Sequence, residues 1–425
     1  MDLEYSAEEE EFRVRLRAWL RAALPRLPAP PDPRDWPARR AYDCGWQRML
    51  YEAGYAGLHW PAEAGGQGAT PTQHLIFLEE TERAGAPYVG AGFVGLLHAG
   101  PTIAAEGTPE QRARWLPPIL RGEQVWCQGF SEPDAGSDLA ALRTRAVRDG
   151  DDYLVTGSKI WTSHAQVADW CELLVRTGTG RPGAGPAPDG AGSHSDPDGP
   201  GPDGPGPDGA GRDGAAPGGA DTSRHRGLSW LALPMDAPGV TVRPLRTLAG
   251  TAEFAEVFLD GVRVPVANRI GAENDGWRVT LVTLSFERGT AFAGEVVACR
   301  RVLREVARAA RDNGRWDDPV LRRRLGRLAA DFSALWRLIQ WNVSEAQHTG
   351  GLPGTGGSVF KLRYSHARQE LFDAAAEVLG PLALDADQRW TADRLSSLAY
   401  TIAAGTSQIQ RNIVAERILG LPRGR

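Results

Sequence analysis

The sequence Phe-Ser-Glu-Pro-Asp-Ala-Gly-Ser-Asp occupies residues 130–138, and Gly-Ser-Lys-Ile-Trp-Thr-Ser follows at residues 157–163. Small residues and hydroxyl groups at the end of a strand offer N–H and O–H donors to a flat polar ring. The indole of Trp161 can cover one face of such a ring by stacking. An ordinary surface turn and a core tryptophan would explain the same residues, so the surrounding elements must decide between these interpretations.

A second informative stretch is Ala-Ala-Gly-Thr-Ser-Gln-Ile-Gln-Arg-Asn, at residues 403–412. Gly405 breaks the helix before it, and Ser407 with Gln410 is a candidate capping box for the helix after it. The free N–H groups at a helix N-terminus suit a pyrophosphate or a developing oxyanion. A well-capped turn between two helices is the alternative from these residues alone.

The 425 residues divide into a helical, a strand-rich and a second helical part. Residues 1–124 have helical periodicity, beginning with a capping box at Ser6 and Glu9. Between residues 125 and 272, short strands and turns predict an antiparallel β-barrel or sandwich. In the order of the chain, the predicted strands are 143–147, 153–156, 170–175, 229–233, 240–245 and 253–259.

Residues 273–425 predict an α-helical bundle, because several long amphipathic segments follow one another with short connections. The predicted helices are 277–312, 320–349, 358–379, 394–403 and 407–419. The fold class is therefore α+β: a helical domain, a β domain and a helical bundle. Within the β domain, residues 178–226 are Pro-Asp-Gly repeats almost without large apolar side chains, which predicts a disordered insertion.

Composition and charge exclude several classes of protein. The net charge is -5, which gives no general affinity for nucleic acid. No apolar run approaches the roughly 20 residues of a membrane span, and the acidic N-terminus lacks the features of a signal peptide. Scattered cysteines without a CxxC pair argue against a zinc site or a disulfide framework. We expect a cytoplasmic protein without metal or membrane insertion.

Taken together, the domain order and the two segments resemble the acyl-CoA dehydrogenase family across nearly the whole chain. Residues 130–140 resemble the first signature of that family, and residues 405–422 resemble its C-terminal FAD-contacting helix. The resemblance implies FAD as the cofactor, with the flavin ring between the β domain and the bundle. It also implies oxidation of an acyl-CoA or acyl-carrier thioester between its α and β carbons.

The resemblance assigns roles residue by residue. Thr406 and Gln408 would hold the ribityl and diphosphate region of FAD, and Ser137 would touch the acyl-CoA thioester arm. The residues expected to line the isoalloxazine ring are Gln128, Phe130, Ser131, Trp161 and Ser163.

The chain departs from many members of the family at the position of the catalytic base. Ala404 stands where those members carry a glutamate, and a methyl group cannot accept a proton. A second branch, with isovaleryl- and long-chain dehydrogenases, places the glutamate just before an arginine on the first long bundle helix. Glu287 and Arg288 match that pair. Glu287 is therefore the expected α-proton base, Arg288 is expected near the CoA side, and the Ala404 N–H still faces the thioester carbonyl.

A further departure concerns the adenine end of FAD, which a second subunit contacts in this family. The usual Arg-x-x-Phe-Gly-x-Pro motif is altered in residues 311–319, where Arg311 or Arg315 is the candidate substitute. The glycine-rich segment before the last helices is also replaced, by residues 379–382. The resemblance implies a homo-oligomer, a dimer or tetramer, or a heteromer, with an electron-transfer flavoprotein or another acceptor. Two alternatives are a non-catalytic subunit of a heteromeric dehydrogenase and a relative that performs flavin-dependent oxygenation.

Overall fold

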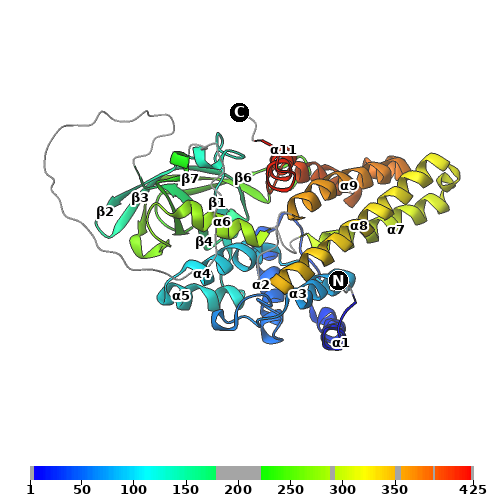
Figure 1. Cartoon of the computed structure of the whole chain (residues 1–425), viewed down its shortest axis with the longest axis horizontal. Coiled ribbons are helices and arrows are strands. Elements are labelled where there is room, and N and C mark those ends of the chain that lie inside the picture. Colours follow the sequence, from blue (N-terminus) through cyan, green and yellow to red (C-terminus); the bar gives the residue numbers. More distant parts are fainter. Residues whose placement is uncertain (1–3, 179–221, 288–291, 350–355, 386–387, 423–425) are drawn as a thin grey trace, which may run out of the picture.

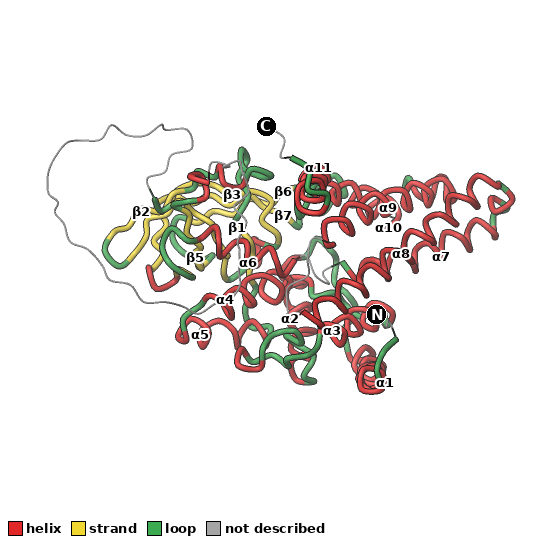
Figure 2. Tube along the Cα trace, viewed as in Figure 1, coloured by secondary structure: helices red, strands yellow, loops and turns green. Residues whose placement is uncertain are grey.

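The structure is a computed structural model that describes residues 4–178, 222–287, 292–349, 356–385 and 388–422. Figure 1 shows the sheet at one end, the long bundle helices projecting at the other, and the N-terminal helices packed beside both. Figure 2 shows the same separation of helix and strand. Most of the predicted insertion, residues 179–221, lies outside the described residues. The expected α+β architecture, helical, then strand-rich, then helical, is confirmed.

The N-terminal helices begin at residues that the sequence encodes locally. Ser6 accepts a hydrogen bond from the Glu9 N–H and Glu9 bonds back, so the predicted capping box is present. Thr70 and Thr108 form the same motif, each followed by proline at the first helical position. The helices are α1 (Ala7–Ala23), α2 (Trp36–Glu52), α3 (Pro71–Arg83), α4 (Gly100–Glu106) and α5 (Pro109–Leu120).

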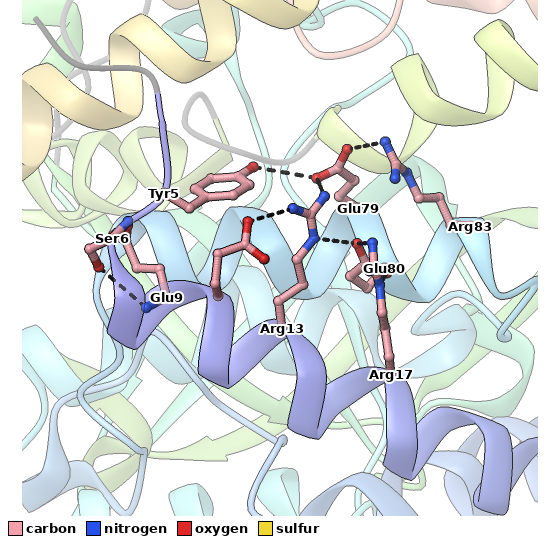
Figure 3. Close-up of polar contacts among 9 residues, drawn as sticks. Tyr5, Ser6, Glu9, Arg13, Arg17, Glu79, Glu80 and Arg83 are labelled. Carbon is pink, nitrogen blue, oxygen red and sulfur yellow. Dashed lines mark hydrogen bonds and ion pairs between the residues drawn. The ribbon is translucent and has the colours of Figure 1, made fainter.

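A buried ionic network joins α1 to α3 (Figure 3). Glu79 and Glu80 on α3 are almost completely buried. Arg13 and Arg17 of α1 donate to Glu80 over 2.8 and 2.5 Å, and Arg83 donates to Glu79 over 2.6 Å. Buried carboxylates are tolerated only when they are paired in this way. The network therefore fixes the first helix to the helix that packs on the bundle.

Eight strands form one sheet among the described residues, in the order β6-β7-β3-β2-β4-β5-β8, with β1 paired to β4. Most pairs are antiparallel, as predicted, but β1 and β2 each pair with β4 in parallel. The predicted turn at residues 149–151 joins β2 to β3. The strands are β1 (Trp126–Gly129), β2 (Arg145–Asp149), β3 (Asp152–Ser163), β4 (Trp170–Arg176), β5 (Leu228–Pro234), β6 (Val240–Leu245), β7 (Phe254–Pro265) and β8 (Arg269–Ile270).

The bundle helices differ from the predicted ones at three places. The predicted helix 277–312 is two helices, with residues 288–291 between them outside the description. The predicted helix 394–403 begins earlier and ends in a 3-10 turn, Leu398–Thr401. After Ile413 the backbone continues as a π-turn. The helices are α6 (Gly276–Glu287), α7 (Ala293–Asp312), α8 (Pro319–Thr349), α9 (Gly356–Leu379), α10 (Arg389–Ser397) and α11 (Ser407–Ile413).

The cores connect these parts across the sequence. One hydrophobic core combines the N-terminal helices with one side of the sheet, including Trp126, Phe130 and Trp230. Another fills the bundle and includes Leu75 of α3. The β domain and the bundle therefore share the N-terminal domain as a common support. None of the described helices combines the length and the apolar character that a membrane span requires.

Candidate active site

The first half of the candidate site is the chain that follows β1. Gln128 lies opposite Glu172 in the parallel pairing of β1 with β4. Its amide nitrogen donates to Glu172 Oε1 over 2.8 Å and lies 3.2 Å from His98 Nδ1. Glu172 and His98 are buried. Gln128 is therefore tied to the interior through polar side chains that sequence analysis did not single out.

The loop after Phe130 is fastened to β3 by a buried ion pair. Lys159 Nζ donates to Glu132 Oε1 over 2.9 Å and to the Phe130 carbonyl over 3.1 Å. Glu132 also accepts from the backbone N–H groups of Arg143 and Thr144 over 2.6 and 2.8 Å. This arrangement gives the buried carboxylate and ammonium the multiple partners that burial requires.

The pKa values of the pair reflect burial and mutual attraction. Burial by itself would raise the pKa of Glu132, but the charge of Lys159 and the N–H donors outweigh it, so this pKa lies below its ordinary value. Burial lowers the pKa of Lys159, and the Glu132 carboxylate offsets part of that change. The ionised pair is thus the form that holds the loop.

The remaining predicted ring-lining residues lie close in sequence to this pair. The Ser131 carbonyl accepts from the Ile160 N–H over 2.9 Å, and the Phe130 ring is buried in the core. Trp161 has a positive φ of 60° and a side chain that is 60% exposed. It lies where the pairing of β3 with β7 is irregular, and Ser163 is the last residue of β3. An exposed indole on strained backbone is typical of a ligand platform.

The second half of the site is the turn between the 3-10 turn at residues 398–401 and α11. Ala404 and Gly405 both have left-handed backbones, with φ values of 51° and 82°. Thr406, rather than Ser407, caps α11 by accepting from the Ile409 N–H over 3.2 Å. The predicted capping box of Ser407 and Gln410 is therefore wrong. Gln410 Nε2 donates instead to the carbonyls of Ala404 and Gly405 over 3.1 and 3.3 Å.

A polar pocket of about 380 Å³ opens beside this turn. Two buried atoms of its lining, Ser407 Oγ and His366 Nε2, have no hydrogen-bond partner among the described residues. Buried polar groups without partners point to a missing polar ligand or water. Thr406 and Gln408 both line this pocket, and their contact with FAD stays a prediction. The lining residues are His366, Gln369, Thr401, Ile402, Thr406, Ser407, Gln408 and Arg411.

The predicted base and its neighbour are only partly described. Glu287 is the last residue of α6, but its side chain and the whole of Arg288 lie outside the described residues. The helix itself is firmly placed, because Thr102 of α4 donates to Thr283 over 2.9 Å. Ser137 is exposed in the loop after Glu132. The positions of these three side chains relative to a ligand stay predictions.

A polar cluster near the turn was missed at the sequence level. Glu295 of α7 accepts hydrogen bonds from the hydroxyl groups of Tyr364 and Tyr400, the second over 2.9 Å. The guanidinium of Arg368 lies 4.3 Å from the centre of the Tyr400 ring. Burial and then Glu295 raise the pKa of Tyr400 well above its usual value, so its hydroxyl stays a donor. The cluster anchors the chain four residues before Ala404, and no short motif could have indicated it.

The candidates for the adenine-end contact already have partners within the chain. Arg311 stacks on Trp316 with its guanidinium carbon 4.1 Å from the ring centre. Arg315 lies 3.4 Å from Glu377. Exposed contacts of this kind contribute little free energy. The structure therefore does not favour either arginine as the contact to the adenine end of FAD.

Comparison with known proteins agrees with the fold. Three acyl-CoA dehydrogenase family models match the chain: the N-terminal domain over residues 6–123, the middle domain over 127–187 and the C-terminal domain over 274–419. Acyl-CoA dehydrogenase IpdE1 of Mycobacterium tuberculosis is 36% identical over 428 residues, covering 97% of this chain and 98% of that protein.

Solved structures show the same likeness. The structure described as the Tcur3481-Tcur3483 steroid ACAD has a TM-score of 0.78 and 30% identity, covering 100% of both chains. The ChsE4-ChsE5 complex from Mycobacterium tuberculosis has a TM-score of 0.74 and 32% identity, also over 100% of both chains. This chain therefore belongs to the acyl-CoA dehydrogenase family of FAD-dependent oxidoreductases, which act on CH–CH bonds.

Proposed function

We propose that this chain binds FAD and catalyses the α,β-dehydrogenation of an acyl-CoA or acyl-carrier thioester. The observation that carries the proposal is the polar pocket beside α11. It contains Ser407 Oγ and His366 Nε2, two buried atoms without a hydrogen-bond partner in the described part of the chain, together with Thr406, Gln408 and Arg411. Hydroxyl, amide and guanidinium groups in one pocket suit the ribityl and diphosphate portion of FAD.

The β domain would hold the flavin ring. Trp161 supplies an exposed aromatic face, and the Lys159–Glu132 pair fixes the backbone that leads from Phe130 past Ser131. Ser163 at the end of β3 and Gln128 on β1 complete the set. Bound FAD would supply the acceptor for the hydride that leaves the β carbon, at flavin N5.

The chain itself would supply the proton acceptor and the hydrogen bonds. Glu287 removes the α proton, which is acidified when the thioester carbonyl accepts hydrogen bonds. The Ala404 N–H provides one of these bonds, although the residue has no acidic side chain. Arg288 and Ser137 would contact the thioester arm. The fixed position of α6 against α4 supports Glu287 as a positioned base.

A bulky acyl group fits the sequence best. Alanine at position 404 is smaller than the glutamate that many members of the family carry there, and this leaves volume near the reacting carbons. The relative described as a steroid ACAD supports a polycyclic acyl group in particular. We propose an electron-transfer flavoprotein or another protein acceptor for reoxidation.

An oligomer is part of this proposal. Several large apolar side chains in the C-terminal part of the chain are exposed, and exposed apolar surface is typical of protein interfaces. They include Leu382, Leu384, Leu398, Ile402, Leu419 and Leu421. Arg311 or Arg315 would contact the adenine end of FAD in a partner subunit, because the exposed contacts that they make within this chain contribute little free energy.

The test is anaerobic bleaching of the bound flavin by straight-chain, branched and steroid side-chain acyl-CoA thioesters. We expect the steroid thioesters to bleach the flavin fastest. In the Glu287→Gln protein, bleaching should slow by about 10²–10⁴-fold while FAD stays bound. Undiminished bleaching in that variant excludes Glu287 as the base.

A non-catalytic role within a heteromer is the second candidate, and the relative described as the ChsE4-ChsE5 complex favours it. In that case a complex reconstituted with the partner chain would bleach equally fast with wild-type protein and with Glu287→Gln. If Glu287→Gln slows bleaching equally in the isolated chain and in the complex, this candidate is eliminated.

A further inference from the structure

The use of lysine in this chain is unusual. Among its 48 basic residues, only Lys159 and Lys361 are lysines, and all the others are arginines. Both lysines are almost completely buried. A lysine presents a compact charge that can lose its proton, whereas the arginine fork is larger and always charged. Positions that keep lysine in so arginine-rich a chain are therefore those where a guanidinium would not serve.

Each lysine donates to a backbone carbonyl in one half of the candidate site. Lys159 bonds the Phe130 carbonyl, as described above, while Lys361 Nζ donates to the Gly405 carbonyl over 2.6 Å. Phe130 begins one signature segment and Gly405 lies in the other. Each lysine thus holds a backbone carbonyl of one signature segment, although Lys159 lies on a strand and Lys361 on a helix.

Lys361 belongs to a face of α9 whose polar side chains donate to residues 400–405. One helical turn later, Ser365 Oγ donates to the Tyr400 carbonyl over 2.8 Å. One turn further, Gln369 Nε2 donates to Thr401 Oγ1 over 3.4 Å. Residues four apart lie on the same side of a helix. The same face of α9 therefore fixes the chain from Tyr400 to Gly405.

The turn needs this support because its backbone is strained. A left-handed conformation costs a non-glycine residue about 1 kcal/mol or more, and Ala404 adopts one. Gln410 donates to the carbonyls of Ala404 and Gly405, and Lys361 also donates to the Gly405 carbonyl. Each carbonyl shares a rigid peptide plane with the N–H of the next residue, so these bonds fix the two planes that follow Ala404, those of the Gly405 and Thr406 N–H groups. Before Ala404, the Ala403 N–H donates to the Ala399 carbonyl over 2.8 Å. The backbone of Ala404 is therefore held from both sides.

We infer that Lys361 is a positioning residue that holds Ala404 in its left-handed conformation, so that the Ala404 N–H meets the thioester carbonyl of an acyl-CoA. This inference rests on the proposed function, and it deepens it by naming the side chain that orients the hydrogen-bond donor. Burial alone lowers the pKa of Lys361 to about 8. Retaining an ammonium there works against stability, which is typical of a residue kept for function.

The experiment compares the FAD-bound wild type with Lys361→Met and with Arg363→Met as a matched control. Arg363 lies on the same helix, is partly exposed, and pairs with Asp331 and Glu370 away from the turn. Amide hydrogen exchange of residues 400–411 is measured first, without substrate. We expect faster exchange at Ala404–Thr406 in Lys361→Met only, and wild-type exchange in Arg363→Met.

Anaerobic flavin bleaching by a saturating acyl-CoA is measured next. The maximal rate in Lys361→Met should fall by about 10²-fold, because a small displacement of an oriented donor has effects of that size. The acyl-CoA concentration for half-maximal rate should change much less. Wild-type exchange or a wild-type maximal rate in Lys361→Met would overturn the inference. If no acyl-CoA bleaches the wild type, the proposed function fails, and the exchange measurement alone then decides whether Lys361 fixes the turn.

Discussion

Lys159 and Lys361 perform the same structural task in opposite electrostatic surroundings. Lys159 shares its ammonium between the Phe130 carbonyl and the carboxylate of Glu132, which itself has two backbone donors. Burial alone accounts for the lowered pKa of Lys361, and its bond is to the carbonyl of Gly405. The strand half of the site is therefore held by a charge pair that also stabilises the fold. The bundle half is held by a charge that burial disfavours.

This difference teaches that similar contacts can serve different ends. A buried ion pair cannot lose one partner without leaving the other charge uncompensated. A single buried ammonium leaves no such partner behind when it is replaced by an apolar side chain. The first lysine is thus required by the fold, while we propose that the second is required by the reaction.

The largest expected effect is on global stability when the pair is broken. Lys159→Met should lower the free energy of unfolding by about 3–5 kcal/mol, since Glu132 is left charged and buried. Lys361→Met should stay within about 1 kcal/mol of wild type at neutral pH, because it removes a disfavoured charge and one hydrogen bond. Urea unfolding of the FAD-saturated proteins measures both. Equal decreases in the free energy of unfolding of the two variants would contradict the proposed difference between the two lysines.

The next effect is a pH dependence that belongs to Lys361. Its pKa is lowered from 10.5 to about 8 in the folded protein. Between these two values the unfolded chain binds a proton that the folded chain has lost, so stability rises with pH in that window. Relative to Lys361→Met, the wild type should gain up to about 3 kcal/mol across it, and nothing below it. Urea midpoints of both proteins at several pH values test this, and parallel curves would contradict it.

A smaller effect is expected at Trp161 in the β domain, where a substitution should weaken binding of the flavin ring without changing the stability of the fold. Trp161 is 60% exposed, so Trp161→Ala should leave the unfolding midpoint of the apoprotein unchanged. Loss of aromatic stacking should weaken FAD binding by about 10-fold. Fluorescence titration of the apoprotein with FAD measures this, and Trp161→Phe should recover most of the affinity. Unchanged affinity in Trp161→Ala would remove the indole from the flavin site.

The smallest expected effect concerns the cap of α11 in the bundle half. Thr406→Ala removes the hydroxyl that accepts from the Ile409 N–H, which should cost about 1 kcal/mol in local stability. Hydrogen exchange at Ile409 should accelerate, and Thr406→Ser should restore it. Unchanged exchange would mean that the turn, rather than the cap, holds the start of α11.

Some elements of the fold could be predicted from the sequence because their signals are local. The capping box at Ser6 and Glu9 and the hairpin around Gly150 each depend on residues within a few positions of one another. Where two local signals competed, the prediction failed. Ser407 and Gln410 have the right spacing for a capping box, but Thr406 caps the helix and Gln410 turns back to the strained carbonyls.

The sequence by itself determined the domain order, the family and the two segments proposed to form the site, since periodicity and short motifs record these directly. Only the tertiary structure decided how the segments are held. Lys361 and the Gly405 carbonyl are 44 residues apart, and Lys159 lies 29 residues from Phe130. Any carbonyl can accept from an ammonium, so no local pattern marks which one will. The packing of α9 against the turn, and of β3 against the loop after β1, makes that choice.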